Sequence, residues 1–191
     1  MSADVRSRMI EGAVRLLATE GVEGTSFANV LAATDSPRGS VYHHFPGGKA
    51  ELVREALDFA CEAAMATMEA ARGKPARAVV QQFLDLWREL LIDSDLRAGC
   101  VVMAVTVAAG DESLRKYAGD IFRRWTEQLI GLFAEAGVDR RSARQLATTL
   151  ISAMEGAVAL SRAEQSSEPF EDVCAALLRL ADTLSKRTRP K

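Results

Sequence analysis

The chain has 191 residues, 48% hydrophobic and 26% charged, which is typical of a soluble folded protein with one compact domain or a small module joined to a larger one. No run of about 18 apolar residues occurs and the N-terminus lacks the apolar core of a signal peptide, so we expect no membrane span and a cytoplasmic protein. The net charge of −2 and the pI of about 5.8 exclude a generally basic nucleic-acid binder, so any DNA binding must be local.

The first predicted helix runs from Ala3 to Glu20, where apolar residues recur close to a period of 3.6. Gly21 fits the left-handed residue that commonly follows a helix. Thr25 or Ser26 can cap a second, short helix, because a side-chain oxygen there can accept from the backbone N–H groups of the first turn.

A third short helix is predicted after a turn at Asp35-Ser36. Pro37 fits the first position of this helix with Ser36 as its N-cap, and the sequence from Pro46 to Gly48 ends it. The turn between the second and third helices is only a few residues long, which is typical of a helix-turn-helix.

The rest of the chain also has a helical pattern, and no stretch alternates as a β-strand between hairpin turns would. A long helix is predicted from about Lys49 to Arg72, and a helix-breaking Gly-Lys-Pro follows it. The later helical segments are expected at about Ala76–Ile92, Leu96–Ala109, Glu112–Ala136, Arg141–Ala163 and Glu171–Ser185. We therefore predict an all-α chain with two domains, a helix-turn-helix module (residues 1–48) and a helical body (residues 49–191).

The third helix has the residues of a major-groove reader, since the second helix of a helix-turn-helix enters that groove. Arg38 can bond guanine O6 and N7 together. Gly39 costs about 0.8–1.0 kcal/mol in a helix relative to alanine, which fits a backbone that must approach the groove wall. Ser40 is small and can bond a base or a phosphate, and Tyr42 and His43 can reach phosphates at the edge of the groove.

Two further residues are predicted to contact DNA phosphates. Lys49 opens the long helix, where the helix dipole makes a cation mildly unfavourable. A DNA phosphate placed between this helix start and the Lys49 ammonium would interact favourably with the helix dipole and with the ammonium. Thr25, near the start of the second helix, can reach another phosphate in the same way.

The adjacent histidines His43 and His44 do not form a metal or catalytic pair in our interpretation. Helical metal pairs are spaced i, i+4, and the chain has no further histidine and no Cys-x-x-Cys. His44 is expected to pack or cap near Phe45. The sequence Gly47-Gly48-Lys49 lacks the spacing and the preceding strand of a phosphate-binding P-loop.

The helical body contains candidates for a ligand pocket, although aromatic and methionine side chains in such a body are core residues by default. Pockets for drug-like molecules are apolar with a few polar anchors, and methionine adapts to varied ligands. The apolar candidates are Phe83, Trp87, Met103, Phe122, Trp125, Phe133 and Met154, and the polar candidates are Thr106, Gln128 and Thr149.

Small residues recur between Arg141 and Leu160, at Ala143, Ala147, Ala153, Gly156 and Ala157. A stripe of small residues allows helices to approach closely, which fits a two-fold interface. The apolar segment Glu171–Leu184 would be the second helix in a four-helix dimer bundle. Ordinary packing within one chain is the alternative.

The N-terminal quarter of the chain resembles the TetR family of bacterial transcriptional regulators. The resemblance is carried by Glu20-Gly21, by Gly24-Thr25-Ser26, and by Arg38-Gly39-Ser40-Val41-Tyr42-His43-His44-Phe45 with Lys49 and Leu52. The longer sequence from Pro37 to Lys49 is similar to a subgroup that includes repressors of multidrug-efflux genes, and Gly99-Cys100-Val101-Val102 resembles the same subgroup. Where the family usually has Gly, an apolar residue and Ser, this chain has Asp35-Ser36-Pro37, and Asp tolerates the left-handed conformation.

This resemblance implies about nine helices, a homodimer, a near-palindromic double-stranded DNA operator, and a body that holds an inducer pocket and the dimer interface. It places Arg38, Gly39, Ser40 and His43 at bases or the groove, and Thr25, Tyr42 and Lys49 at phosphates. We expect a transcriptional regulator, a repressor that a small hydrophobic inducer releases from its operator.

Two alternatives are an enzyme that uses the body pocket and a helical protein-interaction module. The body has no nucleophile, base and orienting group together, so we expect no enzyme and no cofactor. Cys61, Cys100 and Cys174 are odd in number and widely spaced, which favours a reducing compartment.

Overall fold

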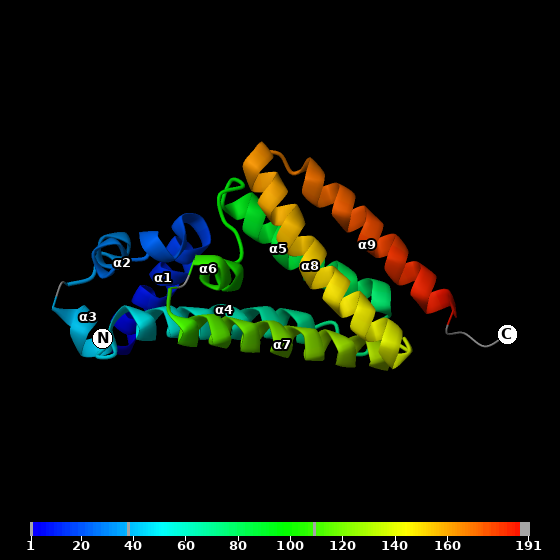
Figure 1. The fold of residues 1–191 in the computed structure, drawn as a ribbon, viewed down its shortest axis with the longest axis horizontal. Helices are drawn as coiled ribbons and strands as arrows, with labels where there is room; N and C mark the ends of the chain where they lie inside the picture. Colours follow the sequence, from blue (N-terminus) through cyan, green and yellow to red (C-terminus); the bar gives the residue numbers. More distant parts are fainter. Residues whose placement is uncertain (1, 38, 109, 188–191) are drawn as a thin grey trace. The chain divides into compact units, whose positions relative to one another are not determined.

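The computed structural model describes residues 2–37, 39–108 and 110–187. In these ranges the chain forms nine helices and no strand, which confirms the predicted all-α class (Figure 1). In chain order they are α1 (Ser2–Gly24), α2 (Phe27–Thr34), α3 (Ser40–His44), α4 (Gly48–Glu69), α5 (Ala76–Asp93), α6 (Val101–Ala108), α7 (Glu112–Glu135), α8 (Arg140–Glu164) and α9 (Glu168–Arg187).

Two helices, α3 and α6, begin later than the sequence predicts. Helix α3 begins at Ser40 with Gly39 as its N-cap, since the Ser36 hydroxyl oxygen accepts from the Thr34 hydroxyl at 2.9 Å instead of capping a helix. Helix α6 begins at Val101 instead of near Leu96. Leu96 has a φ of 57°, a left-handed conformation that a helix does not contain.

The chain divides into two compact units that combine distant segments. The first unit comprises residues 1–63 and 100–121, and the second comprises residues 64–99 and 122–191. Helices α4 and α7 each contribute their first turns to the first unit and their last turns to the second. Among the described residues, no helix has both the length and the apolar character that a membrane crossing requires.

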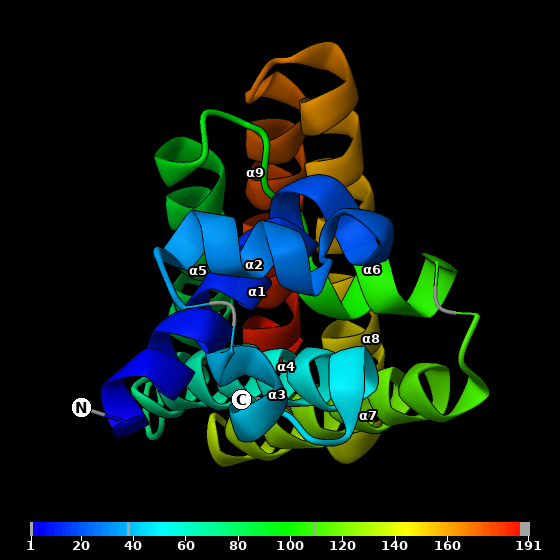
Figure 2. The ribbon, with the colours of Figure 1, turned by 90° about the vertical axis from the view of Figure 1, so that its left-hand side faces the viewer.

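In the first unit, α1 packs against α2 and α6. Figure 2 shows this unit from the side on which α2 and the short α3 lie nearest the viewer. Met9, Leu17 and Val30 are buried in its core. Helices α1 and α2 approach closely at Gly12, where a Cβ would lie only 2.4 Å from the Thr34 methyl group. Any larger residue at this position would therefore push the two helices apart.

The second unit contains a helical hairpin, because α8 packs along α9, and α5 packs against both (Figure 1). Its core includes the fully buried Phe83, Phe133 and Phe170. Asp139 caps the start of α8 by accepting from the Ser142 amide at 3.1 Å. These contacts make the second unit a conventional packed helical body.

Candidate nucleic-acid interface and ligand site

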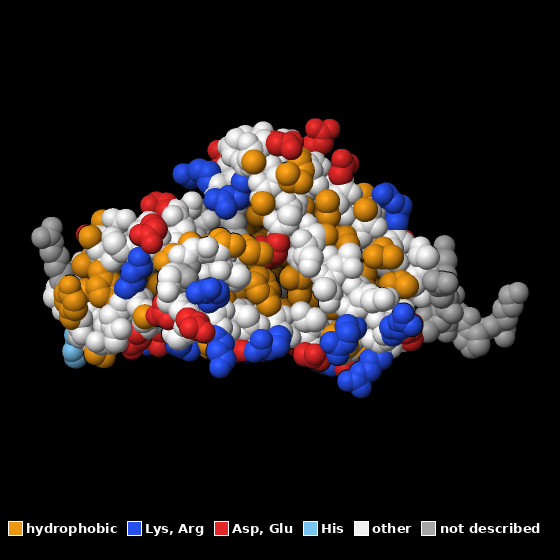
Figure 3. Space-filling model, viewed as in Figure 1, with side chains coloured by type: hydrophobic (Ala, Val, Ile, Leu, Met, Phe, Trp, Pro, Cys, Tyr) orange, Lys and Arg blue, Asp and Glu red, His pale blue; other side chains and the backbone are white. Residues whose placement is uncertain are grey.

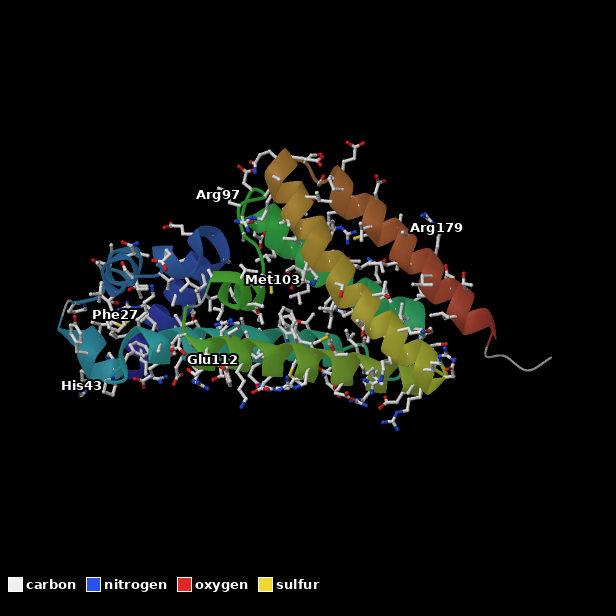
Figure 4. The ribbon with its side chains drawn as sticks, in the orientation of Figure 1. Phe27, His43, Arg97, Met103, Glu112 and Arg179 are labelled. Carbon is white, nitrogen blue, oxygen red and sulfur yellow. The ribbon has the colours of Figure 1, made fainter. Side chains whose placement is uncertain are left out.

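Helix α3 has one buried face and one exposed face. Val41 and Phe45, one turn apart, are buried in the first unit, while Gly39, Tyr42 and His43 are exposed. Figure 4 shows His43 on α3, and Figure 3 shows histidine and apolar side chains at the surface over this helix. The sequence therefore folds locally so that three predicted DNA-contact residues lie outside, on a helix held from inside by two apolar side chains.

The turn before α3 begins at Asp35, which has φ 47° and ψ 46°. This is the left-handed conformation that aspartate tolerates. The amide of Asp35 and that of Ser36 both donate to the carbonyl of Leu31, the latter at 3.1 Å. This pattern ends α2 sharply, and the chain can then reverse toward α3.

Tyr42 is supported by the aromatic ring of Phe27, the first residue of α2. The Tyr42 side chain is 71% exposed, and its ring meets the half-buried Phe27 ring edge-on, with centroids 5.6 Å apart and an interplanar angle of 83°. Such edge-to-face pairs stabilise aromatic rings in one orientation. Only the packing of α2 beside α3 brings these two rings together, so no signal in the sequence could have identified the pair.

Neither the backbone angles nor the space around Gly39, the N-cap of α3, requires a glycine. Its φ of −74° and ψ of −16° suit any residue, and a Cβ there would meet no described atom within 4 Å beyond its chain neighbours. The fold of the chain therefore tolerates a side chain at this exposed position.

The two histidines lie edge to face, with ring centroids 5.3 Å apart. His44 is half-buried and its ring contacts the buried Phe45 ring at 6.5 Å, whereas His43 is exposed. His44 thus packs near Phe45 as expected, and His43 is the histidine that faces outward.

Lys49 is half-buried, and its ammonium donates to the carbonyl oxygen of Val22 at 2.6 Å. An ammonium has three N–H donors, so this bond leaves it capacity for a phosphate. At the same helix start, the Glu51 carboxylate accepts from the Gly47 amide at 2.7 Å, which supplies the negative charge that the helix dipole favours.

Thr25 is fully buried, and its hydroxyl donates to the Gly21 carbonyl at 2.8 Å. A phosphate contact through Thr25 would need this hydroxyl to leave Gly21. Ser26, the other residue that the sequence offered as a cap, is the N-cap of α2 and accepts from the Asn29 amide at 3.1 Å. Arg38 and the side chain of Ser40 lie outside the described part of the chain, and their predicted contacts stay predictions.

The predicted ligand residues fall in both units. Met103 and Thr106 lie on α6 in the first unit, where the Thr106 hydroxyl donates to the Val102 carbonyl at 2.8 Å. The second unit contains the remaining eight. The buried ones are Phe83, Trp87, Trp125, Phe133 and Met154, the half-buried ones are Phe122 and Gln128, and Thr149 is exposed.

The aromatic candidates of the second unit form two edge-to-face pairs. Phe83 and Trp87 lie on α5 with ring centroids 6.2 Å apart, and Phe122 and Trp125 lie on α7 with centroids 5.7 Å apart. Both indole N–H groups are buried without a hydrogen-bond partner among the described residues. Polar atoms in this condition are rare in native proteins and need an explanation.

The small residues of α8 do not all face outward. Ala143, Ala147 and Ala157 are buried by packing within the second unit, which was the alternative to a dimer interface for this stripe. Gly156 and Leu160 are exposed, and Leu160 keeps 52% of its surface exposed. On α9 the Leu180 side chain is 37% exposed.

Comparison with known proteins identifies the class to which this geometry belongs. Residues 9–56 match the bacterial regulatory proteins of the TetR family, and residues 75–176 match the C-terminal domain of transcriptional regulators similar to LmrA and YxaF. The HTH-type transcriptional regulators MT0206 and Rv0196 of two Mycobacterium tuberculosis strains are each 35% identical to this chain over 173 residues, which cover 87% of this chain and 88% of each relative.

The HTH-type transcriptional regulator LmrA of Bacillus subtilis is 25% identical over 172 residues, which cover 87% of this chain and 91% of LmrA. A TetR transcriptional regulator from Legionella pneumophila has the same fold, with a TM-score of 0.82 at 22% identity over 90% of this chain and 94% of that one.

The fold and the exposed α3 define a helix-turn-helix transcriptional regulator with a DNA-binding domain and a C-terminal regulatory domain. The chain belongs to the TetR family. Regulators of this family bind DNA operators and dimerise, and the relatives named here are transcriptional regulators rather than enzymes.

Proposed function

We propose that this protein is a repressor that binds a near-palindromic operator as a homodimer and leaves it when a small hydrophobic inducer binds the helical body. One relative, DhaR of a Mycobacterium species, is named a transcriptional repressor, and it is 24% identical over 177 residues, which cover 87% of each chain. The sequence from Pro37 to Lys49 supports the same direction through its similarity to efflux-gene repressors.

Gly39 carries the proposal that α3 reads DNA. Gly39 is the N-cap of α3 in a conformation that any residue can adopt, and the chain itself leaves room for a side chain at this exposed position. A groove wall that approaches the backbone closely explains why glycine stands there. In this arrangement, Arg38, Gly39 and Ser40 face base edges in the major groove.

Contacts to phosphates position the reading helix. Tyr42 and His43 are exposed on the outer face of α3 and are suited to phosphates beside the groove. Lys49 adds a charge that acts on any DNA sequence, through the N–H groups that its bond to Val22 leaves over. Thr25 would join them only if its hydroxyl left Gly21 when DNA bound.

The dimer places two copies of α3 on successive turns of the major groove, about 34 Å apart. The exposed side chains of Leu160 on α8 and Leu180 on α9, beside the bare surface of Gly156, support an interface between copies on these two helices. An inducer that prefers a body conformation with mismatched spacing lowers operator affinity by shifting the population toward that conformation.

The test is a gel shift with the DNA upstream of the protein's own gene, using wild type, Gly39→Ala and Gly131→Ala. Gly131 is the matched control, because a Cβ there also meets nothing within 4 Å and the residue lies on α7. We expect Gly39→Ala to remain folded and to bind operator at least tenfold more weakly, about 1.4 kcal/mol. Equal operator binding by Gly39→Ala and wild type would contradict the proposed reading face.

A selection from random DNA separates the proposal from its alternatives. Recovery of a near-palindromic sequence supports the operator, and recovery of none favours a protein-interaction module. In a reporter strain, deletion of the gene raises expression from a recovered operator if the protein is a repressor and lowers it if the protein is an activator.

A further inference from the structure

The second unit contains buried polar atoms that its own residues leave unsatisfied. Trp125 is 4% exposed, and its indole N–H has no acceptor among the described residues. The side-chain oxygen of Gln128 is buried and has no donor within the same described part of the chain. A buried donor or acceptor without a partner destabilises the fold, so the position of both groups calls for a partner from outside the chain.

The orientation of the Gln128 amide is fixed by its other atom. Its Nε2 donates to the Met65 carbonyl at 3.1 Å and to the Glu69 carboxylate at 3.0 Å. Both partners are acceptors only, so the nitrogen cannot exchange places with the oxygen. The unsatisfied atom of Gln128 is therefore an acceptor, whereas that of Trp125 is a donor.

The two groups stand on one face of one helix. Trp125 and Gln128 are three residues apart on α7, and side chains at this spacing are neighbours on the helix surface. The indole N–H lacks an acceptor and the amide oxygen lacks a donor, yet the two groups do not bond each other. A hydroxyl satisfies both at once, because its oxygen accepts from the indole and its proton goes to the amide oxygen.

Apolar side chains lie beside this pair on α7. Phe122 meets the Trp125 ring edge-on, with an interplanar angle of 87°, and the neighbouring Leu129 is buried. The Glu69 carboxylate, which contacts Gln128, is held by Gln128 Nε2 and by Arg72. A neutral molecule suits such a site better than an anion, because Glu69 is already an acceptor there.

We infer that the second unit binds a neutral aromatic molecule bearing a hydroxyl group, which accepts from the Trp125 indole and donates to the Gln128 side-chain oxygen. This inference rests on the proposed function and deepens it, since such a molecule would be the inducer. Such a site would discriminate between ligands with and without the hydroxyl, because an analogue that lacks the hydroxyl leaves both buried polar groups unpaired.

The experiment uses three probes of one shape, 2-naphthol, 2-methoxynaphthalene and naphthalene, in equilibrium dialysis against the full-length protein. The hydroxyl of 2-naphthol accepts and donates, the methoxy group only accepts, and naphthalene does neither. An ordinary apolar site favours naphthalene, the most apolar of the three. We expect the opposite order, with 2-naphthol bound at least about tenfold more tightly than naphthalene and the methoxy compound between them.

Single substitutions locate the preference. Trp125→Phe keeps the aromatic contact with Phe122 but removes the indole N–H. We expect this variant to lose most of the preference for 2-naphthol over naphthalene. Trp87→Phe removes the other buried indole N–H, on α5. Whatever it does to the affinity for both probes as a predicted pocket residue, it should leave the ratio of 2-naphthol to naphthalene affinity intact. A preference that survives Trp125→Phe, an equal or greater affinity for naphthalene, or no binding of any probe overturns the inference.

A spectroscopic measurement keeps the test valid if Trp125→Phe fails to fold. The chain has two tryptophans, so the Trp87→Phe protein shows one indole N–H signal in a nitrogen–proton correlation spectrum. Saturating 2-naphthol should move this signal downfield, and naphthalene should not; equal shifts with both overturn the inference. Operator binding of the same ligand-free protein distinguishes failure of the proposed function from failure of this inference. A protein that binds no operator contradicts the proposed function. A protein that binds operator but shows no preference for 2-naphthol contradicts only this inference.

Discussion

The ammonium of Lys49 donates to the carbonyl of Val22 at 2.6 Å and so joins the first turn of α4 to the last turn of α1. A cation at a helix start is mildly unfavourable when it stands alone. Here a carbonyl at the end of another helix offsets that cost. Lys49 therefore has a part in the fold of the first unit, in addition to the phosphate contact that we propose.

The substitution Lys49→Met should reveal both parts. It keeps the apolar stem but removes the ammonium, so we expect the free energy of unfolding to fall by about 1 kcal/mol. We also expect weaker binding to all DNA sequences alike, with the salt dependence of binding reduced by about one phosphate contact per protomer. Urea unfolding and DNA binding at several salt concentrations measure the two effects, with the exposed Lys74→Met as control. An unchanged salt dependence would contradict the phosphate contact alone.

Phe27 should matter for operator binding although it is not proposed to touch DNA. Phe27→Ala removes the ring that supports Tyr42, and an edge-to-face pair contributes about 1 kcal/mol. We expect about fivefold weaker operator binding at matched salt, since a free Tyr42 must be ordered when DNA binds. Phe27→Tyr, which keeps a ring at this position, is the control and should bind close to wild type. Equal losses in both variants would show that the ring contact is not the cause.

Tyr117 ties the first turns of α7 to α4 within the first unit. Its hydroxyl bonds the Asp58 carboxylate, and the Arg54 guanidinium lies over its ring at 4.2 Å from the centroid. Tyr117→Phe keeps the ring and the cation–π contact, and we expect it to lower the free energy of unfolding by about 1–2 kcal/mol through the lost bond to a charged group. Thermal and urea unfolding test this, and the same change at the chain's other tyrosine, Tyr42, should leave stability unchanged because that side chain is exposed. No loss in the Tyr117 variant would contradict the importance of this bond.

Leu160→Glu should weaken the proposed dimer without unfolding the protomer. Leu160 is exposed on α8, so a charge there is solvated in the single chain but would be buried between two copies. We expect sedimentation equilibrium to show at least a tenfold weaker association, with unchanged helical content by circular dichroism. Ile92→Glu is the control, because Ile92 is also an exposed apolar residue but lies on α5. Equal dimerisation of Leu160→Glu and wild type would move the interface elsewhere.

The thiol of Cys174 should react slowly in the folded protein. Burial raises its pKa to about 11 from the ordinary 9.0, so the thiolate fraction at pH 8 falls about a hundredfold. The folded chain holds this proton more tightly than the unfolded chain, so the contribution to stability is complete below pH 9 and declines as the pH rises toward 11. Iodoacetamide labelling followed by peptide mass analysis should show modification of Cys174 in urea but not in buffer at pH 8. Comparable rates in both would contradict the burial.

Local signals in the sequence predicted the helices and several of their ends. The 3.6-residue periodicity indicates the all-α fold, and the left-handed φ values of Gly21 and Asp35 agree with turn preferences that depend on one or two residues. The exposed face of α3 also follows from the sequence, because Val41 and Phe45 are the apolar pair at helical spacing.

The partners of individual side chains were decided only by the tertiary structure. The Lys49 bond to Val22 spans 27 residues, the burial of Thr25 depends on how α1 ends against α2, and three of the small residues of α8 face their own unit. The sequence by itself determined a helical chain with a short exposed reading helix, because backbone preferences act between near neighbours. Packing between distant helices selected which polar groups are satisfied inside the protein, because such contacts depend on the positions of whole helices. It left the Trp125 indole N–H and the Gln128 side-chain oxygen without partners among the described residues.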